Sequence, residues 1–220
     1  MSYRSLAGLE RAALERLVGE TVEHFAAQEG LTSFEWKTRG HDEPAELTDW
    51  LAQLGFVPEE AETVMLGEAA VLVDAPAPPV GVVVRRIDDL PDRAALLEAA
   101  ADMQAGVFGH GGGGAELLER VERNQGGTEV WVAEADGVVV SAGRLEVVAG
   151  TECAGLWGGA TVAEWRGRGI YRALTAARAA SALARGVRYL HSDCTEMSRP
   201  ILERSGLRAV TTSTPYIWTL

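Results

Sequence analysis

The sequence predicts an α/β (α+β) fold, with a mixed, mostly antiparallel sheet flanked by helices and preceded by a smaller α/β module. Apolar residues recur at helical spacing in some segments and follow strand-like patterns in others. Asp136-Gly137 separates two apolar runs, which is a strong signal for an antiparallel hairpin. The proline-rich segment 75–79 can join neither a helix nor a ladder of strand hydrogen bonds. We therefore expect a first module at residues 1–78 and a second at residues 79–220.

The first module is expected to contain two helices and two strands. Apolar residues from Leu6 to Phe25 recur at helical spacing and predict one helix that ends at Gly30, with Gly19 as a candidate break. A strand is expected at 31–37. Pro44 suits a first helical turn, so a second helix is expected from there to residue 54, followed by a strand at 62–68.

The second module is expected to contain most of the sheet. Its predicted strands are 82–86, 130–134, 138–148, 154–162, 187–192 and 216–218, and its predicted helices are 90–107, 115–124, 169–185 and 198–205.

Two strand-helix-strand segments share a pattern. The segment from Phe34 through the helix at Pro44 to Val64 parallels the segment from Tyr189 through the helix near Pro200 to Ile217. The first module is therefore interpreted as a degenerate half-copy of the second. The alternative is that such units recur by chance in any α/β protein.

Composition and charge exclude several classes of protein. With 47% hydrophobic and 24% charged residues, the chain is typical of folded proteins, not of disordered or coiled-coil chains. No apolar run is long enough to cross a membrane and no signal sequence is recognised, so we expect a cytoplasmic protein with no membrane partner. The two cysteines, Cys153 and Cys194, suit small buried residues and have no zinc-ligand spacing, so no metal site is expected.

The charge distribution narrows the class of ligand. The net charge of -12 argues against a nucleic-acid partner. Residues 1–80 carry 5 basic and 15 acidic side chains, whereas residues 166–208 carry nine arginines and three acidic residues. The second segment is therefore the candidate for binding an anion.

The segment from Thr161 to Leu174 joins a strand, a short arginine- and glycine-rich loop and a long helix. Glycines expose backbone N–H groups, and the first helical turn adds unpaired donors and the positive end of the dipole. Such a loop binds anions, above all phosphates. The residues after it match neither an ATP-type phosphate loop nor a dinucleotide fingerprint.

The run Arg166-Gly167-Arg168-Gly169-Ile170-Tyr171 resembles the R/Q-x-x-G-x-G/A motif of the GNAT acetyltransferase superfamily, and the likeness extends over residues 82–220. The resemblance implies that acetyl-CoA is the co-substrate. It implies that Gly158-Gly159 marks a bulged strand whose backbone pairs with the pantetheine arm. The implied binding residues are Gly159, Ala160, Thr161 and Val162 for pantetheine, and Arg166, Gly167, Arg168, Gly169, Ile170, Tyr171 and Arg172 for pyrophosphate.

Two positions depart from the family pattern. The last motif position, usually Gly or Ala, is Tyr171, whose side chain either turns away from the phosphate or modifies the site. The family often has a tyrosine four residues before the helix-ending glycine, where it protonates the departing thiolate, but this chain has Leu202 there. Leu202 is expected in the apolar core.

Other side chains are candidates for the chemistry. Ser198 is a candidate proton donor, with a helix N-cap as the alternative. Tyr216 is a second candidate donor. Glu134 could accept the amine proton through a water, or be a solvated hairpin carboxylate. His110, beside a run of glycines, could reach an acceptor or simply be exposed. Because none is compelling, we expect that the thiolate takes its proton from water and that turnover depends on no single acid.

The predicted function is direct transfer of an acetyl group from acetyl-CoA to an amine of a small molecule or peptide. Strand amides near Ala160 would polarise the thioester carbonyl. We expect residues 1–78 to shape the acceptor pocket, and their acidity suggests a cationic acceptor. The alternative function is a non-catalytic acyl-CoA-binding sensor or interaction module. The oligomeric state is not predicted.

Overall fold

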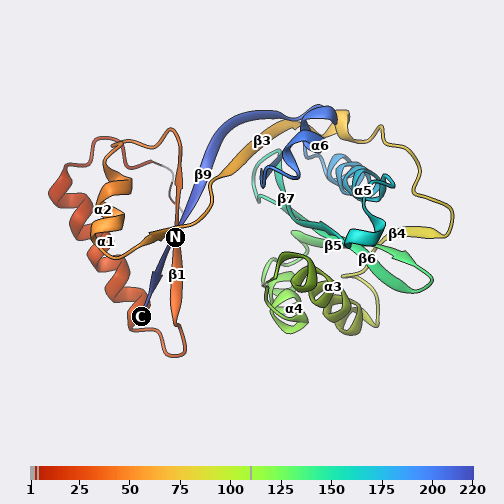
Figure 1. Ribbon diagram of the computed structural model, residues 1–220, viewed down its shortest axis with the longest axis horizontal. Coiled ribbons are helices and arrows are strands. Elements are labelled where there is room, and N and C mark those ends of the chain that lie inside the picture. The colour runs from red at the N-terminus through yellow and green to blue at the C-terminus, as the bar shows by residue number, and fades with distance from the viewer. Residues whose placement is uncertain (1–2, 4, 110) are drawn as a thin grey trace. The chain divides into compact units, whose positions relative to one another are not determined.

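The computed structural model describes residue 3 and residues 5–109 and 111–220 (Figure 1). The chain forms two compact units. One comprises Met1–Val64, Asp193–Arg199 and Ala209–Leu220, and the other comprises Met65–Ser192 and Pro200–Arg208. We call them unit one and unit two. Three strands and one helix contribute residues to both: β3 (Glu62–Glu68), β8 (Tyr189–Cys194), β9 (Arg208–Thr219) and α6 (Arg199–Arg204).

Unit one combines segments from both ends of the chain. Its remaining elements are α1 (Arg11–Ala26), β1 (Ser33–Arg39), α2 (Leu47–Gln53) and β2 (Val57–Pro58). β9 pairs antiparallel with β1 from Ser33↔Thr219 to Arg39↔Ser213. This pairing is why the compact units do not follow the predicted division at residue 78. Whether 1–78 and 79–220 are separate folding modules stays a prediction.

The core of unit one is aliphatic and aromatic. Trp36 and Leu51 are fully buried at 0% exposure, and Tyr216 at 8% packs in the same cluster. Alternate residues of β1 are buried, so one face of the strand covers this core. The helix begins at Arg11, later than expected, and Leu6 reaches the core from irregular chain. α1 continues through Gly19 without a break, and α2 begins at Leu47 rather than Pro44.

Unit two contains the larger share of the sheet. Its remaining elements are η1 (Ala69–Leu72), β4 (Val82–Arg86), α3 (Arg93–Phe108), α4 (Gly114–Arg123), β5 (Thr128–Ala135), β6 (Val138–Val147), β7 (Cys153–Thr161), η2 (Ala163–Trp165) and α5 (Ile170–Ala184). The strands lie in the order β8-β7-β6-β5-β4, antiparallel except for the parallel pair β7 and β8. α3 and α4 lie on one face of this sheet and α5 on the other (Figure 1). The predicted fold class is confirmed.

The hairpin between β5 and β6 forms where its turn residues predict it. Asp136 and Gly137 have φ values of 50° and 77°. Positive φ at both central residues is what a turn matching the strand twist requires, and Asp-Gly tolerates it. The local chemistry of two residues therefore sets the register at the turn end of β5 and β6.

Two expectations need correction or qualification. The final strand was expected at 216–218 but spans Arg208–Thr219, because its pairing with β1 extends the ladder through Ser213. Cys194 is buried as expected, whereas Cys153, the first residue of β7, is partly exposed. Among the described residues, no helix has both the length and the apolar character needed to span a bilayer.

Candidate functional site

The arginine- and glycine-rich loop leads directly into α5. Gly167 and Gly169 have φ values of 74° and 82°, a backbone conformation that side-chain-bearing residues rarely adopt. Gly169 is the N-cap of α5, and no side chain caps the helix there. The first helical hydrogen bond runs from Ala173 N to Gly169 O at 3.0 Å. The N–H groups of the preceding turn therefore have no partner within the helix and face outward for an anion.

The three arginines of this segment differ in their contacts. Arg166 Nε donates to Thr161 O at 3.0 Å, which holds the loop against the end of β7. The guanidinium of Arg168 lies 4.7 Å from the centre of the Trp165 ring, a cation–π contact. Arg172 is exposed in the first turn of α5. Two arginines thus brace the loop, and the segment bears positive charge at the N-terminal end of α5.

β7 carries the predicted bulge. In its pairing with β6, Ala142 lies opposite Ala160 and Arg144 opposite Trp157, so Gly158 and Gly159 together face the single residue Gly143. Gly158 has a φ of 59°. Two residues against one is the signature of a β-bulge, and it turns the strand locally. The expectation that this glycine pair bends the strand is confirmed.

The described pairing of β7 with β8 ends before β7 reaches the bulge. Their described parallel pairing runs only from Cys153↔Tyr189 to Gly155↔His191. Buried Ser192 continues the contact by donating its hydroxyl to Leu156 O at 2.9 Å. From the bulge onward the described pairs of β7 are with β6 alone. On the edge away from β6, residues 159–162 therefore have no described strand partner. Thr161 O on this edge accepts from Arg166 Nε, and the rest of the edge is open to an extended ligand.

Ser141 fixes the backbone of this open segment. It is fully buried on β6, and its hydroxyl lies 2.6 Å from Ala160 O and 2.9 Å from Thr161 Oγ1. These contacts hold Ala160 and Thr161 in extended conformation from the β6 side. The predicted pantetheine-binding residues, Gly159, Ala160, Thr161 and Val162, therefore follow one another at the open edge and lead to the loop.

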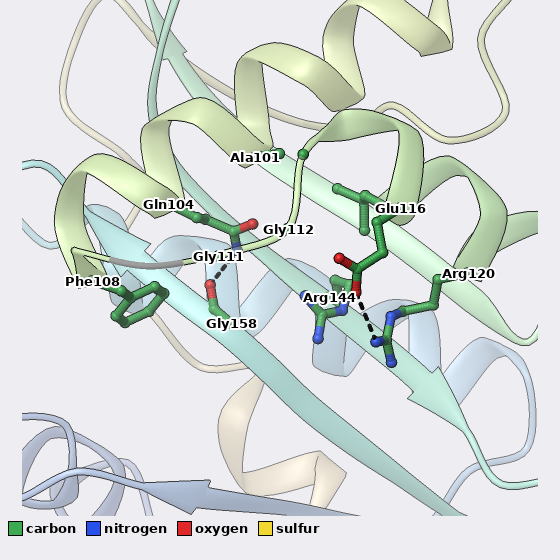
Figure 2. A pocket seen from close by; sticks show the side chains of 11 residues that line it. Ala101, Gln104, Phe108, Gly111, Gly112, Glu116, Arg120, Arg144 and Gly158 are labelled. Carbon is green, nitrogen blue, oxygen red and sulfur yellow. Dashed lines mark hydrogen bonds and ion pairs between the residues drawn. The ribbon is translucent and has the colours of Figure 1, made fainter. Parts of the chain in front are cut away.

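A pocket of about 220 Å³ opens on the α3 and α4 face of the bulge (Figure 2). Gln104 of α3 spans it and donates to Gly158 O at 2.5 Å, as the dashed line in Figure 2 shows. Its lining residues are Ala101, Gln104, Phe108, Gly111, Gly112, Gly113, Glu116, Leu117, Arg120, Arg144 and Gly158. All of them belong to unit two, so this pocket is formed without any residue of 1–78.

The pocket is charged. Arg120 lies 3.8 Å from Glu116 one turn earlier on α4 (Figure 2). Arg144 Nε donates to Glu146 at 3.0 Å. The sequence analysis missed these pocket residues. The glycine run before α4 and the i,i+4 pair of Glu116 and Arg120 were visible signals, but Arg144 has no sequence motif.

The structure separates the expected catalytic residues. Glu134 lies on β5 and forms a two-pronged ion pair with Arg85 at 2.5 and 3.0 Å, so its carboxylate is engaged. Ser198 directly precedes α6, at its N-cap position. Tyr216 lies in the core of unit one. Ser198 and Tyr216 belong to unit one, whereas Glu134 and the loop belong to unit two. The role proposed for His110 lies outside the described residues.

The two departures from the family motif have clear positions. Leu202 on α6 is buried at 1% exposure, as expected. Tyr171 turns its ring toward the bulge, because a Cβ built on Gly159 would lie 2.9 Å from its Cε2 atom and 3.1 Å from its hydroxyl oxygen. The ring thus lies against the bulge of β7, and whether it modifies the binding site stays a prediction.

Solved structures share this architecture. A GCN5-related N-acetyltransferase from Kribbella flavida matches with a TM-score of 0.71 at 17% identity, over 94% of this chain and 76% of that chain. A tandem GNAT protein from the clavulanic acid biosynthesis pathway matches with a TM-score of 0.64 at 17% identity, over 98% and 71%. A GCN5-related N-acetyltransferase from Sphaerobacter thermophilus matches with a TM-score of 0.62 at 18% identity, over 93% and 66%.

The tandem neighbour fits the interpretation of residues 1–78 as a partial copy. No family model matches the sequence, and no curated protein matches it. The loop before α5 carries the motif on which the sequence resemblance rested, and the bulge at Gly158-Gly159 is a feature that the resemblance implied. The fold of this chain is that of the GCN5-related N-acetyltransferases.

Proposed function

We propose that the chain is an N-acetyltransferase that moves an acetyl group from acetyl-CoA directly to an amine of a small molecule or peptide. The observation that carries this proposal is the continuity of three elements: the bulge, the open edge of residues 159–162 and the loop before α5. Together they form one continuous surface that suits the thioester, the pantetheine arm and the pyrophosphate of acetyl-CoA.

The proposed binding mode assigns one part of acetyl-CoA to each element. The amides of Gly167 to Arg172 receive the pyrophosphate, supported by the positive end of α5. The pantetheine arm adds to the open edge of β7 as a further strand would. The thioester then lies at the bulge, where strand amides near Ala160 polarise its carbonyl and stabilise the developing oxyanion.

The acceptor enters from the pocket on the α3 and α4 face. Its lining places Arg120 and Arg144 against Glu116, so this pocket suits an amine that also bears an acidic group. The acidic residues of 1–80 suggested a cationic acceptor instead. Amines of both classes therefore belong in the test. The cytoplasmic location expected from the sequence stays a prediction.

The test is release of free thiol from acetyl-CoA in the presence of an amine panel containing polyamines, basic peptides and amino acids. Mass spectrometry should show the acceptor gaining one acetyl group in step with thiol release. Partly exposed Cys153 reacts with thiol reagents itself, so protein without acetyl-CoA supplies the background. Cys194 contributes little, because burial, foremost, raises the pKa of its thiol to about 11.

A non-catalytic acyl-CoA-binding module is the second candidate. Buried Leu202 at the usual acid position favours it, because that side chain cannot protonate a leaving thiolate. This function predicts that acetyl-CoA binds while no amine in the panel accelerates thiol release. The enzyme proposal fails on that result.

A further inference from the structure

Tyr171 is the polar side chain of α5 that reaches the bulge. Gly159 has no side chain, and a Cβ there would lie 3.1 Å from the tyrosine hydroxyl oxygen. The ring therefore lies against the strand backbone, and its hydroxyl lies beside the residue that precedes Ala160. In the proposed binding mode, the thioester carbonyl lies near Ala160. The phenol is thus next to the bond that acyl transfer breaks.

A buried cation lies close to this phenol. Arg178, two turns along α5, is 1% exposed, and its guanidinium donates to Arg144 O at 3.1 Å and to Thr175 Oγ1 at 3.2 Å. Among the described residues no carboxylate forms an ion pair with it. Burial lowers the pKa of Arg178 to about 10, and the phenolate charge of Tyr171 acts in the opposite direction.

The same interaction acts on the phenol. A neighbouring positive charge favours the ionised form of tyrosine, so a phenolate formed at Tyr171 would be stabilised by Arg178. Arg144 on β6 is the other charged group that interacts with Arg178, and it destabilises the Arg178 cation. Glu146 pairs with Arg144 at 3.0 Å, and a phenolate at Tyr171 would supply a negative charge to Arg178, which has no described carboxylate partner of its own.

We propose that Tyr171 donates the proton to the departing CoA thiolate, with Arg178 as a positioning residue that stabilises the phenolate. This inference rests on the proposed acetyltransferase function, and it replaces the expectation that water supplies the proton. The family motif usually has Gly or Ala where this chain has Tyr171. Tyr171 thus takes the role of proton donor, which the apolar side chain of Leu202 cannot fill.

The step balances as follows. The amine nitrogen forms a bond to the thioester carbonyl carbon and loses its proton to water. The carbon–sulfur bond breaks and its electron pair goes to sulfur, which takes the proton from the Tyr171 hydroxyl. The phenolate, held near Arg178, regains a proton from water. The products are the acetylated amine and CoA.

The first measurement compares wild type with Tyr171→Phe, which keeps the ring against Gly159 and removes only the hydroxyl. We expect kcat for thiol release to fall ~100-fold or more, the usual effect of losing a general acid. Acetyl-CoA affinity by calorimetry should stay within about twofold. Tyr189→Phe on β8 is the matched control, and its kcat should equal that of wild type.

A second measurement detects the phenolate directly. Absorbance titration of wild type minus Tyr171→Phe isolates one phenol among the four tyrosines. We expect the pKa of Tyr171 to lie below the ordinary tyrosine value of ~10 and to rise in Arg178→Met. A merely structural arginine would not move this spectroscopic signal. Should Arg178→Met not fold, the difference between wild type and Tyr171→Phe still gives the pKa.

The outcomes are distinguishable. If wild type binds acetyl-CoA and acetylates an amine, and Tyr171→Phe does so at an equal rate, the inference is overturned while the proposed function stands. An ordinary or raised Tyr171 pKa also overturns the role of Arg178. If wild type binds acetyl-CoA without turnover, both the inference and the enzyme proposal fail.

Discussion

At the scale of single residues, Glu129 shows how unit two stabilises a buried charge. Its side chain is fully buried and accepts hydrogen bonds from Trp131 Nε1 at 2.9 Å, Ser181 Oγ at 2.7 Å and Arg185 at 2.9 Å, while Arg86 lies 3.3 Å away. Burial alone would raise the pKa of Glu129, but these hydrogen bonds and the Arg86 charge outweigh it and hold the pKa below its ordinary value. The ionised form is therefore part of the folded structure.

Replacing this carboxylate should make stability depend less on pH. Because the folded pKa is lowered, the stabilisation is present above the unfolded value of ~4.3 and is lost as the pH falls through the folded pKa. We expect Glu129→Gln to lower the free energy of unfolding by ~3 kcal/mol at neutral pH, because Arg86 and Arg185 lose a buried partner. Urea midpoints at neutral and acid pH should show this difference shrinking.

Glu119→Gln is the control for that experiment, because Glu119 forms an exposed ion pair with Arg123. Its effect should be under ~1 kcal/mol at any pH. If Glu129→Gln lowers the free energy of unfolding by the same amount at neutral and acid pH, the carboxylate charge is not what stabilises the fold.

At the scale of single elements, the bulged region requires glycine on the facing strand. A Cβ on Gly143 of β6 would lie 2.6 Å from Nη1 of Arg178 and 2.9 Å from its Cζ. The guanidinium cannot yield easily, because it is buried and bonded to Arg144 O. We expect Gly143→Ala to lower the free energy of unfolding by ~1–3 kcal/mol through overpacking, measured by chemical denaturation.

Gly106→Ala is the matched variant in the same unit. Gly106 lies inside α3, and nothing lies within 4 Å of the position where its Cβ would be. Alanine favours helix by ~1 kcal/mol over glycine, so this variant should be more stable than wild type. If Gly143→Ala and Gly106→Ala change the free energy of unfolding in the same direction, the bulged region does not require glycine at position 143.

The sequence predicts elements well where local chemistry decides them. β3 and β4 have the predicted bounds, 62–68 and 82–86, and Asp136-Gly137 forms the predicted turn. The length of β9 was underestimated: its pairing with β1 runs from Ser213 to Thr219, so it includes Thr- and Ser-rich chain that was not predicted as strand. Such pairing joins residues far apart in sequence, and no local pattern encodes it.

The residues of the candidate site also differ in whether the sequence predicts them. The glycines of the loop and bulge are readable, because positive φ and close backbone approach demand glycine. The pocket residues Gln104 and Arg144 cannot be predicted from the sequence, because they meet only when α3 packs on β6 and β7. The position of the Tyr171 ring likewise depends on the missing side chain of Gly159 on another element.

At the scale of the whole molecule, the N-terminal residues are expected to be required for folding. Within unit one, Phe34 and Trp36 of β1 cover Tyr216 of β9 in one core, and Trp218 packs against it. Deleting residues 1–78 removes β1 and leaves these aromatic side chains exposed. We expect the truncated protein to bind a hydrophobic dye and to aggregate in size-exclusion chromatography. A truncated protein that stays monomeric, folded and equally active would contradict this view.

The central claim is that unit two binds acetyl-CoA through the loop before α5, and calorimetric titration with acetyl-CoA tests it most directly. Gly169→Asp puts a carboxylate at the N-terminal end of α5, whereas Gly186→Asp puts one just beyond its C-terminal end, at a similar φ of 78° against 82°. Both variants therefore carry similar backbone strain. We predict that wild type and Gly186→Asp bind with affinities within about twofold, and that Gly169→Asp loses ~10-fold or more, about 1.4 kcal/mol. Equal affinity in wild type and Gly169→Asp, or no binding by wild type, would contradict the account.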